Sequence, residues 1–496
     1  MHALEERTKS PSSSARDENS GLVRSLGLFT TVMMVVGGVI GSGIFRKPGL
    51  MASQVGSPEI LLMVWVLAGV ITLFGALSIA EISSVIPETG GQYVYFERLY
   101  GAFPAFLYGW AVFAVIQTGS IAAVAWVFAE YSSQFVTLPF PPGFGTAWSI
   151  HLPFIGDIFP FADLGVKLIA GTLIVFLTIV NCLGVKFGGI VQNAFTIAKI
   201  AAMALLVFGA FILPTGGSGS NLVTTSTIIH PQGWLMVAAI IAALQGAFWG
   251  YDGWNKITYI AGEVKEPQRN IPKALLYGML IVTAIYVTIN LAYAYVLPID
   301  DMAKSRLVAA DVAERCFKGG GRWIAAAVML STFGTTNAII LATARVFFSM
   351  ARRGVFPGCL GKAHPRFHTP GASLIVQGIW SVVLLSSGSF DMLTDTTIFV
   401  SWAFYAAGAF GVFVMRRREP DTPRPYKVPG YPIVPCIFVL FAVLYLVLTV
   451  KNDLSAYHDA VAAGKPALIN SAFGTALVLL GTPIYFYYRW KNSRTD

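Results

Sequence analysis

The sequence predicts an all-α integral membrane protein with twelve transmembrane helices. Hydrophobic residues make up 55% of the 496 residues and charged residues only 12%. Soluble domains average about 25% charged residues, so a chain with half that share is solvated mainly by lipid. Twelve apolar segments reach or approach the roughly 20 residues that a transmembrane helix needs. They centre near residues 27–50, 59–85, 102–135, 164–184, 189–213, 235–261, 272–297, 320–350, 371–388, 393–415, 430–450 and 468–489.

The predicted spans differ in length, and two of the connecting segments have features of their own. The third and eighth spans are longer than the bilayer requires, which indicates tilted helices. The ninth ends early, at the sequence SSGS of residues 386–389. Residues 136–163 are rich in Pro, Phe and Gly and predict a structured cap over the third and fourth spans. Residues 298–319 are polar with helical spacing, which predicts a lid helix outside the membrane.

Two of the predicted spans are interrupted near their middle by glycine. The first is broken at GSG, residues 41–43, and the sixth at GYDG, residues 250–253. Hydrocarbon forms no hydrogen bonds with backbone, so a membrane helix opens only where protein or a polar cavity satisfies the freed groups. Glycine-interrupted spans at matching places in two halves of a chain are typical of a transporter binding site. The alternative is that these glycines mark kinks or close helix contacts.

The distribution of basic residues predicts the orientation in the membrane. The side that carries both chain ends holds 22 Lys and Arg residues, and the opposite side holds 10. Because basic loops stay in the cytoplasm, both termini are expected to be cytoplasmic. The net charge of +9 is therefore a topology signal that requires no nucleic-acid partner. Residues 1–24 are polar, and no cleavable signal peptide is expected.

Several separated motifs carry a resemblance to a known family. Residues 39–45, VIGSGIF, resemble the first-span signature of the amino acid–polyamine–organocation (APC) superfamily, and AE at 80–81 with PETGGQY at 87–93 resembles its loop after the second span. Four further segments resemble the L-type amino acid transporter branch. They are residues 248–255, 263–272, 344–348 and 424–429. The likeness runs from about residue 25 to residue 490, with its motifs in the family's order.

The resemblance implies the leucine-transporter fold, with broken first and sixth helices. Spans one to five (residues 25–213) and six to ten (233–417) would form a 5+5 inverted repeat, and residues 428–490 would add two spans. The segments 1–24 and 491–496 would be cytoplasmic tails. Eukaryotic L-type transporters pair with a glycoprotein through a cysteine in the loop between spans three and four. Residues 136–163 contain no cysteine, which favours a stand-alone, prokaryotic transporter, monomeric or weakly dimeric, without a disulfide-linked heavy chain.

The chemistry of the two breaks suits an amino acid zwitterion. The N-terminus of a half-helix offers unpaired N–H groups and partial positive charge, so the N–H groups of residues 42–44 are predicted to hold the carboxylate. Freed carbonyls suit the ammonium, and those of residues 39–40 and of Trp249 are predicted to hold it. Glycine lets the ligand approach the backbone. The predicted substrate-binding residues are Val39, Ile40, Gly41, Ser42, Gly43, Ile44, Phe248, Trp249, Gly250, Asp252 and Gly253.

Two residues of the second break have open interpretations. Trp249 stands at the family position of an aromatic gate over the bound substrate, and the alternative is a packing tryptophan. Asp252 departs from the small residue that many L-type members have there. A charge in an opened membrane helix is costly unless it faces a cavity or a partner. Asp252 either favours cationic or polar substrates or pairs with Lys256 one turn on.

Lys199 lies within the fifth predicted span, where a charged residue is a functional candidate by default. In relatives of this type, a lysine here occupies the place of the sodium ion that sodium-coupled members bind beside the first break. The resemblance therefore implies sodium independence. A role in proton coupling and a purely structural role as a permanently charged strut remain alternatives.

Further polar and aromatic residues are weaker candidates for the pocket. Asn337 in the eighth span either lines the cavity or joins neighbouring helices, and the second is favoured. Ser401, Phe404 and Tyr405 lie in the tenth span, but some relatives carry an asparagine at the position of Phe404, so that contact cannot be carried over. Near the cytoplasmic face, candidate inner-gate ion pairs involve Glu81, Glu263, Arg269 and Arg345.

These observations predict a sodium-independent secondary transporter of L-amino acids in the plasma membrane, the inner membrane if bacterial. An exchanger of small-to-medium neutral amino acids is favoured, and a proton-coupled symporter or a cationic amino acid transporter is the alternative. A non-transporting amino acid sensor is more remote. All six histidines fall in loops or tails, so neither an enzyme nor a metal site is expected, and no cofactor is implied. Membrane lipid is the expected surrounding, and a channel is disfavoured.

Overall fold

The computed structural model describes residues 24–141, 144–145, 148–184, 189–213, 217–367 and 369–493. Within these ranges the chain is almost entirely helical, with one antiparallel pair of short strands. Nine helices among the described residues are long and apolar enough to cross a membrane, and a pair of helices bent by 42° at a break makes a tenth. The prediction of an all-helical membrane protein is confirmed at this level.

The chain folds into elements whose bounds follow the apolar segments of the sequence. In chain order they are α1 (Leu28–Val39), α2 (Gly43–Val55), α3 (Pro58–Val85), α4 (Gln92–Tyr100), α5 (Ala102–Ala111), the π-helical turn η2 (Val112–Ile116), α6 (Gln117–Ser132), β1 (Ile150–Leu152), β2 (Gly156–Ile158), α7 (Leu164–Cys182), α8 (Gly189–Ile212), η3 (Gly219–Leu222), α9 (Trp234–Tyr251), η4 (Trp254–Glu263), α10 (Pro267–Val296), α11 (Ile299–Lys304), α12 (Val308–Cys316), α13 (Gly320–Arg352), η5 (Gly358–Gly361), α14 (Gly371–Ser387), α15 (Phe390–Arg418), α16 (Ile433–Ala462), α17 (Asn470–Leu479) and α18 (Gly481–Asn492).

Two of the twelve predicted spans are shorter than a typical membrane helix. The ninth is α14, whose 17 residues end at Ser387, as the sequence SSGS predicts. The twelfth is divided between α17 and α18, which meet at Leu480 and have 10 and 12 residues. The count of twelve spans therefore stays a prediction. The long third span is α5, η2 and α6 in direct succession, and η2 is a single π-helical turn, a local widening that often occurs at functional sites.

Local sequence signals set where the long helices begin. The side chain of Ser57 accepts a hydrogen bond from the Ile60 N–H at 3.3 Å, and Pro58 follows at the first helical position of α3. Ser389 caps α15 in the same way, with 3.2 Å to the N–H of Met392. Serine at the cap and proline at the next position are both favoured, because they satisfy or remove a free N–H group at the helix start.

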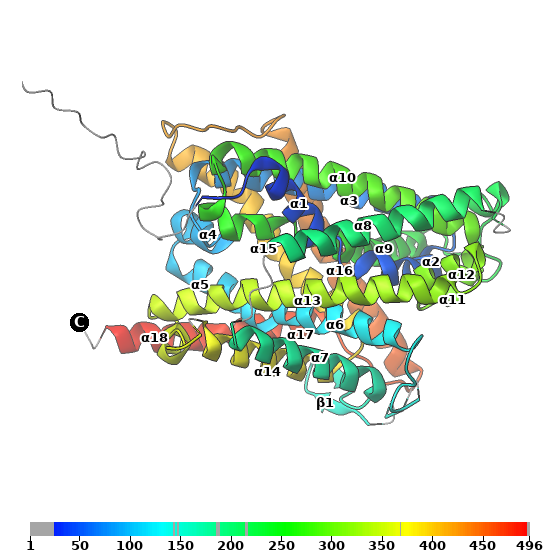
Figure 1. Ribbon diagram of the computed structural model, residues 1–496. Coiled ribbons are helices and arrows are strands. Elements are labelled where there is room, and N and C mark those ends of the chain that lie inside the picture. The colour runs from blue at the N-terminus through cyan, green and yellow to red at the C-terminus, as the bar shows by residue number, and fades with distance from the viewer. Residues whose placement is uncertain are drawn as a thin grey trace, which may run out of the picture.

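The packing of the helices brings the two predicted breaks together. Helix α1 packs along α10, α2 packs along α9, and α3 packs against both α9 and α10. Helix α13 crosses the molecule beside α6 and α8, and α15 packs against α16, α3 and α6 (Figure 1). The junction of α1 with α2 and the junction of α9 with η4 therefore lie next to each other inside the bundle.

The two ends of the bundle have different structures. Helices α4, α5 and α18 lie at one end, and α11 and α12 lie at the other (Figure 1). We call these the α4 end and the α12 end. The predicted lid helix over residues 298–319 forms as two short helices, α11 and α12, which pack against α2 and α13 respectively.

The described part of the predicted cap, residues 136–163, contains the hairpin of β1 and β2. Its strands pair antiparallel, with His151 opposite Asp157. The backbone N–H of Asp157 donates to the carbonyl of Ala467 at 2.8 Å, and that of Phe159 donates to Ser387 at 3.1 Å. The hairpin is thus attached to the end of α14 and to the segment before α17. Residues 142–143 and 146–147 of the predicted cap lie outside the described residues.

Candidate functional site

The first break separates α1 from α2 in the middle of the bundle. The N–H of Ile40 makes the last helical bond of α1, to Val36 at 2.9 Å, and Ile40 itself is extended, with φ −69° and ψ 91°. Helix α2 begins after Ser42. The first N–H groups of a helix have no partner within it and carry partial positive charge. This junction therefore presents N–H groups from α2 and carbonyl groups from α1 within a few residues.

The second break is shorter than the four residues GYDG (250–253) that the sequence predicts for it. Gly250 and Tyr251 are still in α9, and the helix opens at Asp252, which is extended with φ −67° and ψ 153°. Gly253 then takes φ 101°, a backbone conformation that favours glycine, and η4 begins at the next residue. The sharp change of direction therefore occurs at Asp252 and Gly253.

The two breaks touch through their glycines. A Cβ atom placed on Gly43 would lie 2.6 Å from the Cα atom of Gly250, and one placed on Gly253 would lie 2.6 Å from the carbonyl oxygen of Gly38. Both distances are too short for non-bonded carbon or oxygen. Glycine is therefore required at these two crossings, because the backbones of the two broken helices pass in direct contact.

A tyrosine from α10 connects the two breaks. The Tyr286 hydroxyl lies 3.1 Å from the carbonyl oxygen of Val39 and 2.9 Å from that of Gly250, and its single hydrogen is shared between them. The side chain is fully buried and packs edge-on against Trp65, with 5.3 Å between ring centroids. Sequence analysis missed this residue. The available signal was weak: a tyrosine in the seventh predicted span, which contains other Tyr, Thr and Asn residues as well.

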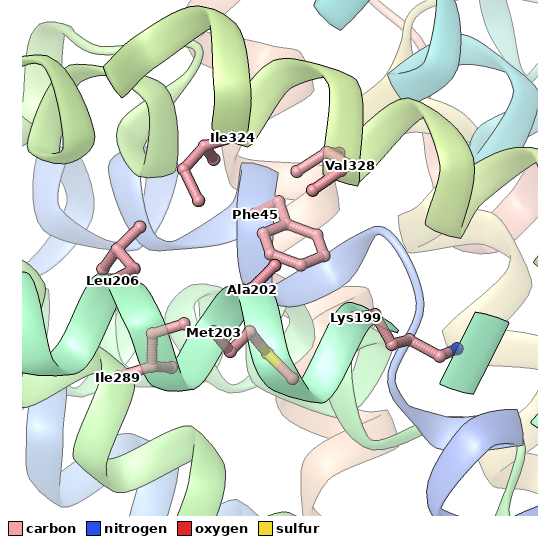
Figure 2. A pocket seen from close by; sticks show the side chains of 9 residues that line it. Phe45, Lys199, Ala202, Met203, Leu206, Ile289, Ile324 and Val328 are labelled. Carbon is pink, nitrogen blue, oxygen red and sulfur yellow. The ribbon is translucent and has the colours of Figure 1, made fainter. Parts of the chain in front are cut away.

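Lys199 closes the C-terminal end of α1. Its ammonium, on a buried side chain of α8, donates to the carbonyl of Gly37 at 2.8 Å and to that of Ile40 at 2.6 Å. Figure 2 shows the side chain extending from α8 away from the apolar residues Phe45 and Met203, toward the chain between α1 and α2. A cation is stabilised at the carbonyl end of a helix by the helix dipole. Lys199 therefore lies directly against the first break.

A small cavity lies between the breaks, and Trp249 is one of the residues that line it. The Trp249 indole N–H donates to the hydroxyl of Ser42 at 3.2 Å, which joins the two broken helices by their side chains. The cavity has a volume of about 20 Å³, enough for about one water molecule. Its lining residues are Gly38, Val39, Gly41, Ser42, Ser120, Val124, Trp249, Asp252, Lys256, Thr335 and Ile339. The walls have to separate before a larger molecule enters.

Asp252 lines this cavity together with Lys256, and a hydroxyl from α15 reaches its carboxylate. The Tyr405 hydroxyl donates to the Asp252 carboxylate at 2.7 Å. Lys256 lines the same cavity, so one negative and one positive side chain face the space between the breaks. Tyr405 also packs against Trp254, at 5.2 Å between ring centroids. The structure thus brings Tyr405 of the tenth predicted span to the second break.

The other predicted site residues lie around the cavity without lining it. Phe248 packs on Trp402, at 3.9 Å between ring centroids, and Phe404 packs on Tyr108 at 5.3 Å. Asn337 accepts a hydrogen bond of 2.8 Å from Asn181, which joins α13 to α7, as the interpretation of a helix-joining residue predicts. The predicted residues absent from the cavity lining are Ile40, Gly43, Ile44, Phe248, Gly250, Gly253, Asn337, Ser401, Phe404 and Tyr405.

A buried charge cluster at the α12 end does not follow from the sequence, in which Lys47 is only one of the ten basic residues opposite the chain ends. Lys47 is inside α2 and fully buried, and its ammonium lies 2.9 Å from Asp391 and 3.2 Å from Asp395 of α15. Next to it, Arg46 pairs with Glu130 of α6 at 2.9 Å. The available signal was a pair of carboxylates one helical turn apart in an apolar span. These pairs join α2 to α15 and α6.

At the α4 end, only some of the residues predicted for the inner gate form ion pairs with one another. Arg345 pairs with Glu263 at 3.5 Å. Glu81 pairs with Arg416 of α15, through two hydrogen bonds of 2.7 and 2.8 Å. Arg269 lies 3.7 Å from its neighbour Glu266. The candidate set therefore contains one pair between its members, and Glu81 instead joins α3 to α15.

Comparison with known proteins gives relatives over nearly the whole chain. A model of the amino acid permease family matches residues 26–469. The chain is 31% identical over 474 residues to the serine/threonine exchanger SteT of Bacillus subtilis, which covers 95% of this chain and 98% of that protein. It is 32% identical over 435 residues to the b(0,+)-type amino acid transporter 1 of Homo sapiens, covering 88% and 84% of the two chains. The large neutral amino acids transporter small subunit 2 of Mus musculus is 31% identical over 480 residues, covering 96% and 83%.

These matches extend far beyond the motifs that first indicated the family. The family model covers the first break, the second break, Lys199 and the lysine–carboxylate cluster in one alignment. The relatives agree with the predicted resemblance to the APC superfamily and its L-type branch. The chain therefore belongs to the amino acid permease family of the APC superfamily.

Proposed function

We propose that this protein is a sodium-independent exchanger of small-to-medium neutral L-amino acids that works by alternating access. The observation that carries the proposal is the direct contact of two broken helices beside a small cavity, with the Lys199 ammonium hydrogen-bonded to the end of the first of these helices. The named activity of the Bacillus subtilis relative, serine/threonine exchange, supports both the substrate class and the exchange mode.

The substrate's α-amino and α-carboxylate groups are proposed to bind to backbone at the first break. Residues 42–44 begin α2, and their N–H groups suit the carboxylate. The carbonyls of Val39 and Ile40 already accept hydrogen bonds from Tyr286 and Lys199. A carbonyl has two lone pairs, so each of these oxygens retains one for the substrate ammonium. Both charged groups are needed for binding, because the ammonium binds to the carbonyl end of α1 and the carboxylate binds to the N–H groups at the start of α2.

The charges around the cavity favour a neutral side chain. Asp252 and Lys256 both line it, so their charges cancel, and Asp252 also accepts a hydrogen bond from Tyr405. An additional unpaired charge buried there would cost several kcal/mol. Cationic amino acids are the second candidate, because the Asp252 carboxylate lies at the break itself and would attract a lysine or arginine side chain once Tyr405 moved away.

Sodium independence follows in this proposal from the position of Lys199. Its ammonium supplies a fixed positive charge to the carbonyls of Gly37 and Ile40. A sodium ion bound to the same oxygens would be repelled by that charge. Proton coupling through Lys199 is the alternative, and it requires the ammonium to lose its proton during the transport cycle.

The proposed membrane arrangement has twelve spans, with spans one to five and six to ten as inverted repeats. Both termini are cytoplasmic, and the protein lies in the plasma membrane, the inner membrane if the source is bacterial. The excess of Lys and Arg on the side of the chain ends supports this orientation. The protein is proposed to act as a single chain without a disulfide-linked heavy chain, since residues 136–163 contain no cysteine.

Counterflow in proteoliposomes made with the purified chain alone tests the function. Vesicles loaded with unlabelled serine are expected to accumulate labelled serine, with the same rate in sodium and in choline buffers. A panel of twenty amino acids as competitors then ranks the side chains, and alanine, serine and leucine are expected to compete better than arginine. Accumulation driven by a pH gradient into empty vesicles would favour the proton symporter, and binding without flux would favour the sensor.

A further inference from the structure

An apolar groove lies on the outer surface of the bundle, between α8, α12 and α13. Its volume is about 570 Å³, far larger than the cavity between the breaks. Helix α8 contributes residues from Ala198 to Leu213, α12 contributes Cys316, and Trp323 of α13 lies at its border. The groove is separate from the residues proposed to bind the substrate.

Small side chains on one face of α8 make the groove. Ala198, Ala201, Ala202 and Gly209 line it, and their spacing of three, four and seven residues places them on one side of the helix. A Cβ atom on Gly209 would lie 3.6 Å from the Cys316 sulfur, an ordinary contact distance. The hollow therefore exists because these positions carry little or no side chain, and it has room for a larger group.

The position of the groove exposes it to the lipid bilayer. Apolar residues along its edges are largely exposed, with Leu205 at 71%, Ile212 at 72% and Trp323 at 74%. The stretch from Ala198 to Leu213 measures about 22 Å along a helix. Half of the hydrocarbon core is about 15 Å thick, so the groove extends through the depth of one lipid leaflet. A groove of this length and apolar lining fits a lipid acyl chain.

Basic side chains stand at the mouth of the groove, where α12 connects to α13. Lys318 and Arg322 are exposed and directly adjoin Phe317 and Trp323, which line the groove. The carboxylate nearby, that of Glu314, accepts hydrogen bonds from the backbone of Gly319 at 2.9 Å and Gly321 at 3.0 Å, and it also interacts electrostatically with Lys318 and Arg322. Tryptophan and basic residues at a helix end are typical of the membrane interface. Two cations thus stand at the connection of α12 and α13, each next in sequence to a residue that lines the groove.

We propose that this groove binds one acyl chain of an anionic phospholipid, whose phosphate lies against Lys318 and Arg322. The apolar walls supply the site for the chain, and the two cations select the headgroup, since each basic residue near an anionic membrane surface favours binding. A zwitterionic lipid would fill the same walls and gain less from the two cations.

The proposed lipid would contact residues that also surround Lys199. A smaller cavity, shown in Figure 2, is lined by Lys199 and Phe45, and it shares Ala202, Leu206 and Ile324 with the groove. Only one layer of α8 side chains therefore separates the bound chain from the residues around the first break. The lipid would stabilise α8 in the position from which Lys199 reaches α1.

Native mass spectrometry of the full-length protein in detergent tests the proposal without any transport measurement. The protein is incubated with equal amounts of phosphatidylglycerol and phosphatidylcholine, and the retained lipids are counted. We expect one phosphatidylglycerol per chain, with a preference of about tenfold over phosphatidylcholine. The double variant K318Q/R322Q should lose that preference, whereas K465Q, which removes an exposed lysine elsewhere, should keep it.

Blocking the groove tests the place of the acyl chain. The variant G209L should reduce retention of both lipids at least about fivefold, and G209A, whose Cβ fits at ordinary contact distances, should not. A201L, at an exposed position of the same face, is a second blocking variant if G209L elutes as aggregate in size exclusion. The proposal is overturned if the parent protein retains both lipids equally, if K318Q/R322Q keeps the preference, or if a folded blocking variant retains lipid like the parent.

Discussion

The Lys199 ammonium donates a hydrogen bond of 2.6 Å to the carbonyl oxygen of Ile40, the residue at which α1 ends. A second bond of 2.8 Å reaches the carbonyl of Gly37. The last carbonyls of a broken membrane helix have neither a helical partner nor bulk water, and each would cost about 1–3 kcal/mol if left without a donor. One cation from α8 satisfies two of them, so the fifth predicted span is connected to the opened end of the first.

Replacement of this lysine is the first prediction. Lys199→Ala removes the donor to two buried carbonyls and the charge at the end of α1, so serine counterflow should fall at least about tenfold, the effect of about 1.4 kcal/mol. Sodium should not restore it, because one lost ammonium does not create a full set of oxygen ligands. Lys273→Ala, an exposed lysine of α10, is the control. Normal exchange by Lys199→Ala across pH 5 to 8 would show that Lys199 is not needed for transport.

Tyr286 gives a second prediction, because its hydroxyl lies between the carbonyls of Val39 and Gly250. Tyr286→Phe removes one oxygen and leaves the ring that packs on Trp65. The loss of a buried hydrogen bond costs about 1 kcal/mol or more, so both the melting temperature and the exchange rate should fall. Tyr277→Phe on the exposed side of the same helix should change neither. Equal melting temperatures for the two variants would contradict a connecting role for Tyr286.

The sequence predicted the apolar helices and the two breaks well because both leave local signals. A membrane helix needs a continuous apolar stretch, and a break in it needs glycine, as Gly253 shows with φ 101°. The contact of Gly43 with Gly250 could not be predicted, since it depends on how α2 packs on α9. Tyr286 was missed for the same reason: its role comes from two carbonyls on other helices.

Lys47 shows a second limit of sequence reasoning. It stands beside Arg46 near the end of the first predicted span, where basic residues are expected at the membrane surface and not in the core. In the structure it is fully buried, because Asp391 and Asp395 come from a helix more than 340 residues away in the sequence. Partners at such a separation leave no local pattern, and only the fold brings them together.

The cluster of Lys47, Asp391 and Asp395 gives a third prediction: replacing the lysine should destabilise the protein more than replacing either aspartate. Lys47→Gln removes the cation that the two carboxylates share, and breaking a buried ion pair by removing one partner is strongly destabilising. Asp391→Asn leaves the ammonium with Asp395 at 3.2 Å, so it should be milder. Asp391 and Asp395 are partly exposed, which reduces both effects.

Melting temperature and serine counterflow measure this difference. We expect Lys47→Gln to lower both more than Asp391→Asn or Asp395→Asn does, and the double variant D391N/D395N to resemble Lys47→Gln. Lys304→Gln, an exposed lysine at the same end, is the control. If Asp391→Asn alone were as damaging as Lys47→Gln, the second carboxylate would not share the charge of Lys47.

Trp249 gives a fourth prediction, because its indole lines the cavity between the breaks and donates to Ser42 at 3.2 Å. Trp249→Ala opens the cavity and removes the stacking surface, so turnover should fall while the backbone groups at the first break remain. Trp249→Phe keeps an aromatic ring but lacks the N–H donor, so its turnover should lie between those of the parent and Trp249→Ala. Trp148→Ala, an exposed tryptophan outside the bundle core, is the control. Uptake by Trp249→Ala equal to that of the parent at every serine concentration would exclude a gating role.

Asp252 is expected to decide between neutral and cationic substrates, and two variants should change selectivity in opposite directions. The parent carboxylate accepts a hydrogen bond of 2.7 Å from Tyr405 and shares its cavity with Lys256. Asp252→Asn removes the negative charge, so arginine should compete with labelled serine even less well than in the parent. Tyr405→Phe removes the hydroxyl donor and leaves the carboxylate exposed to the cavity, so competition by arginine should rise several-fold. Competition by leucine serves as the internal control, because its side chain carries no charge for Asp252 to attract. If arginine displaces serine from the parent better than alanine or leucine does, the neutral substrate class is wrong and Asp252 recognises the cation.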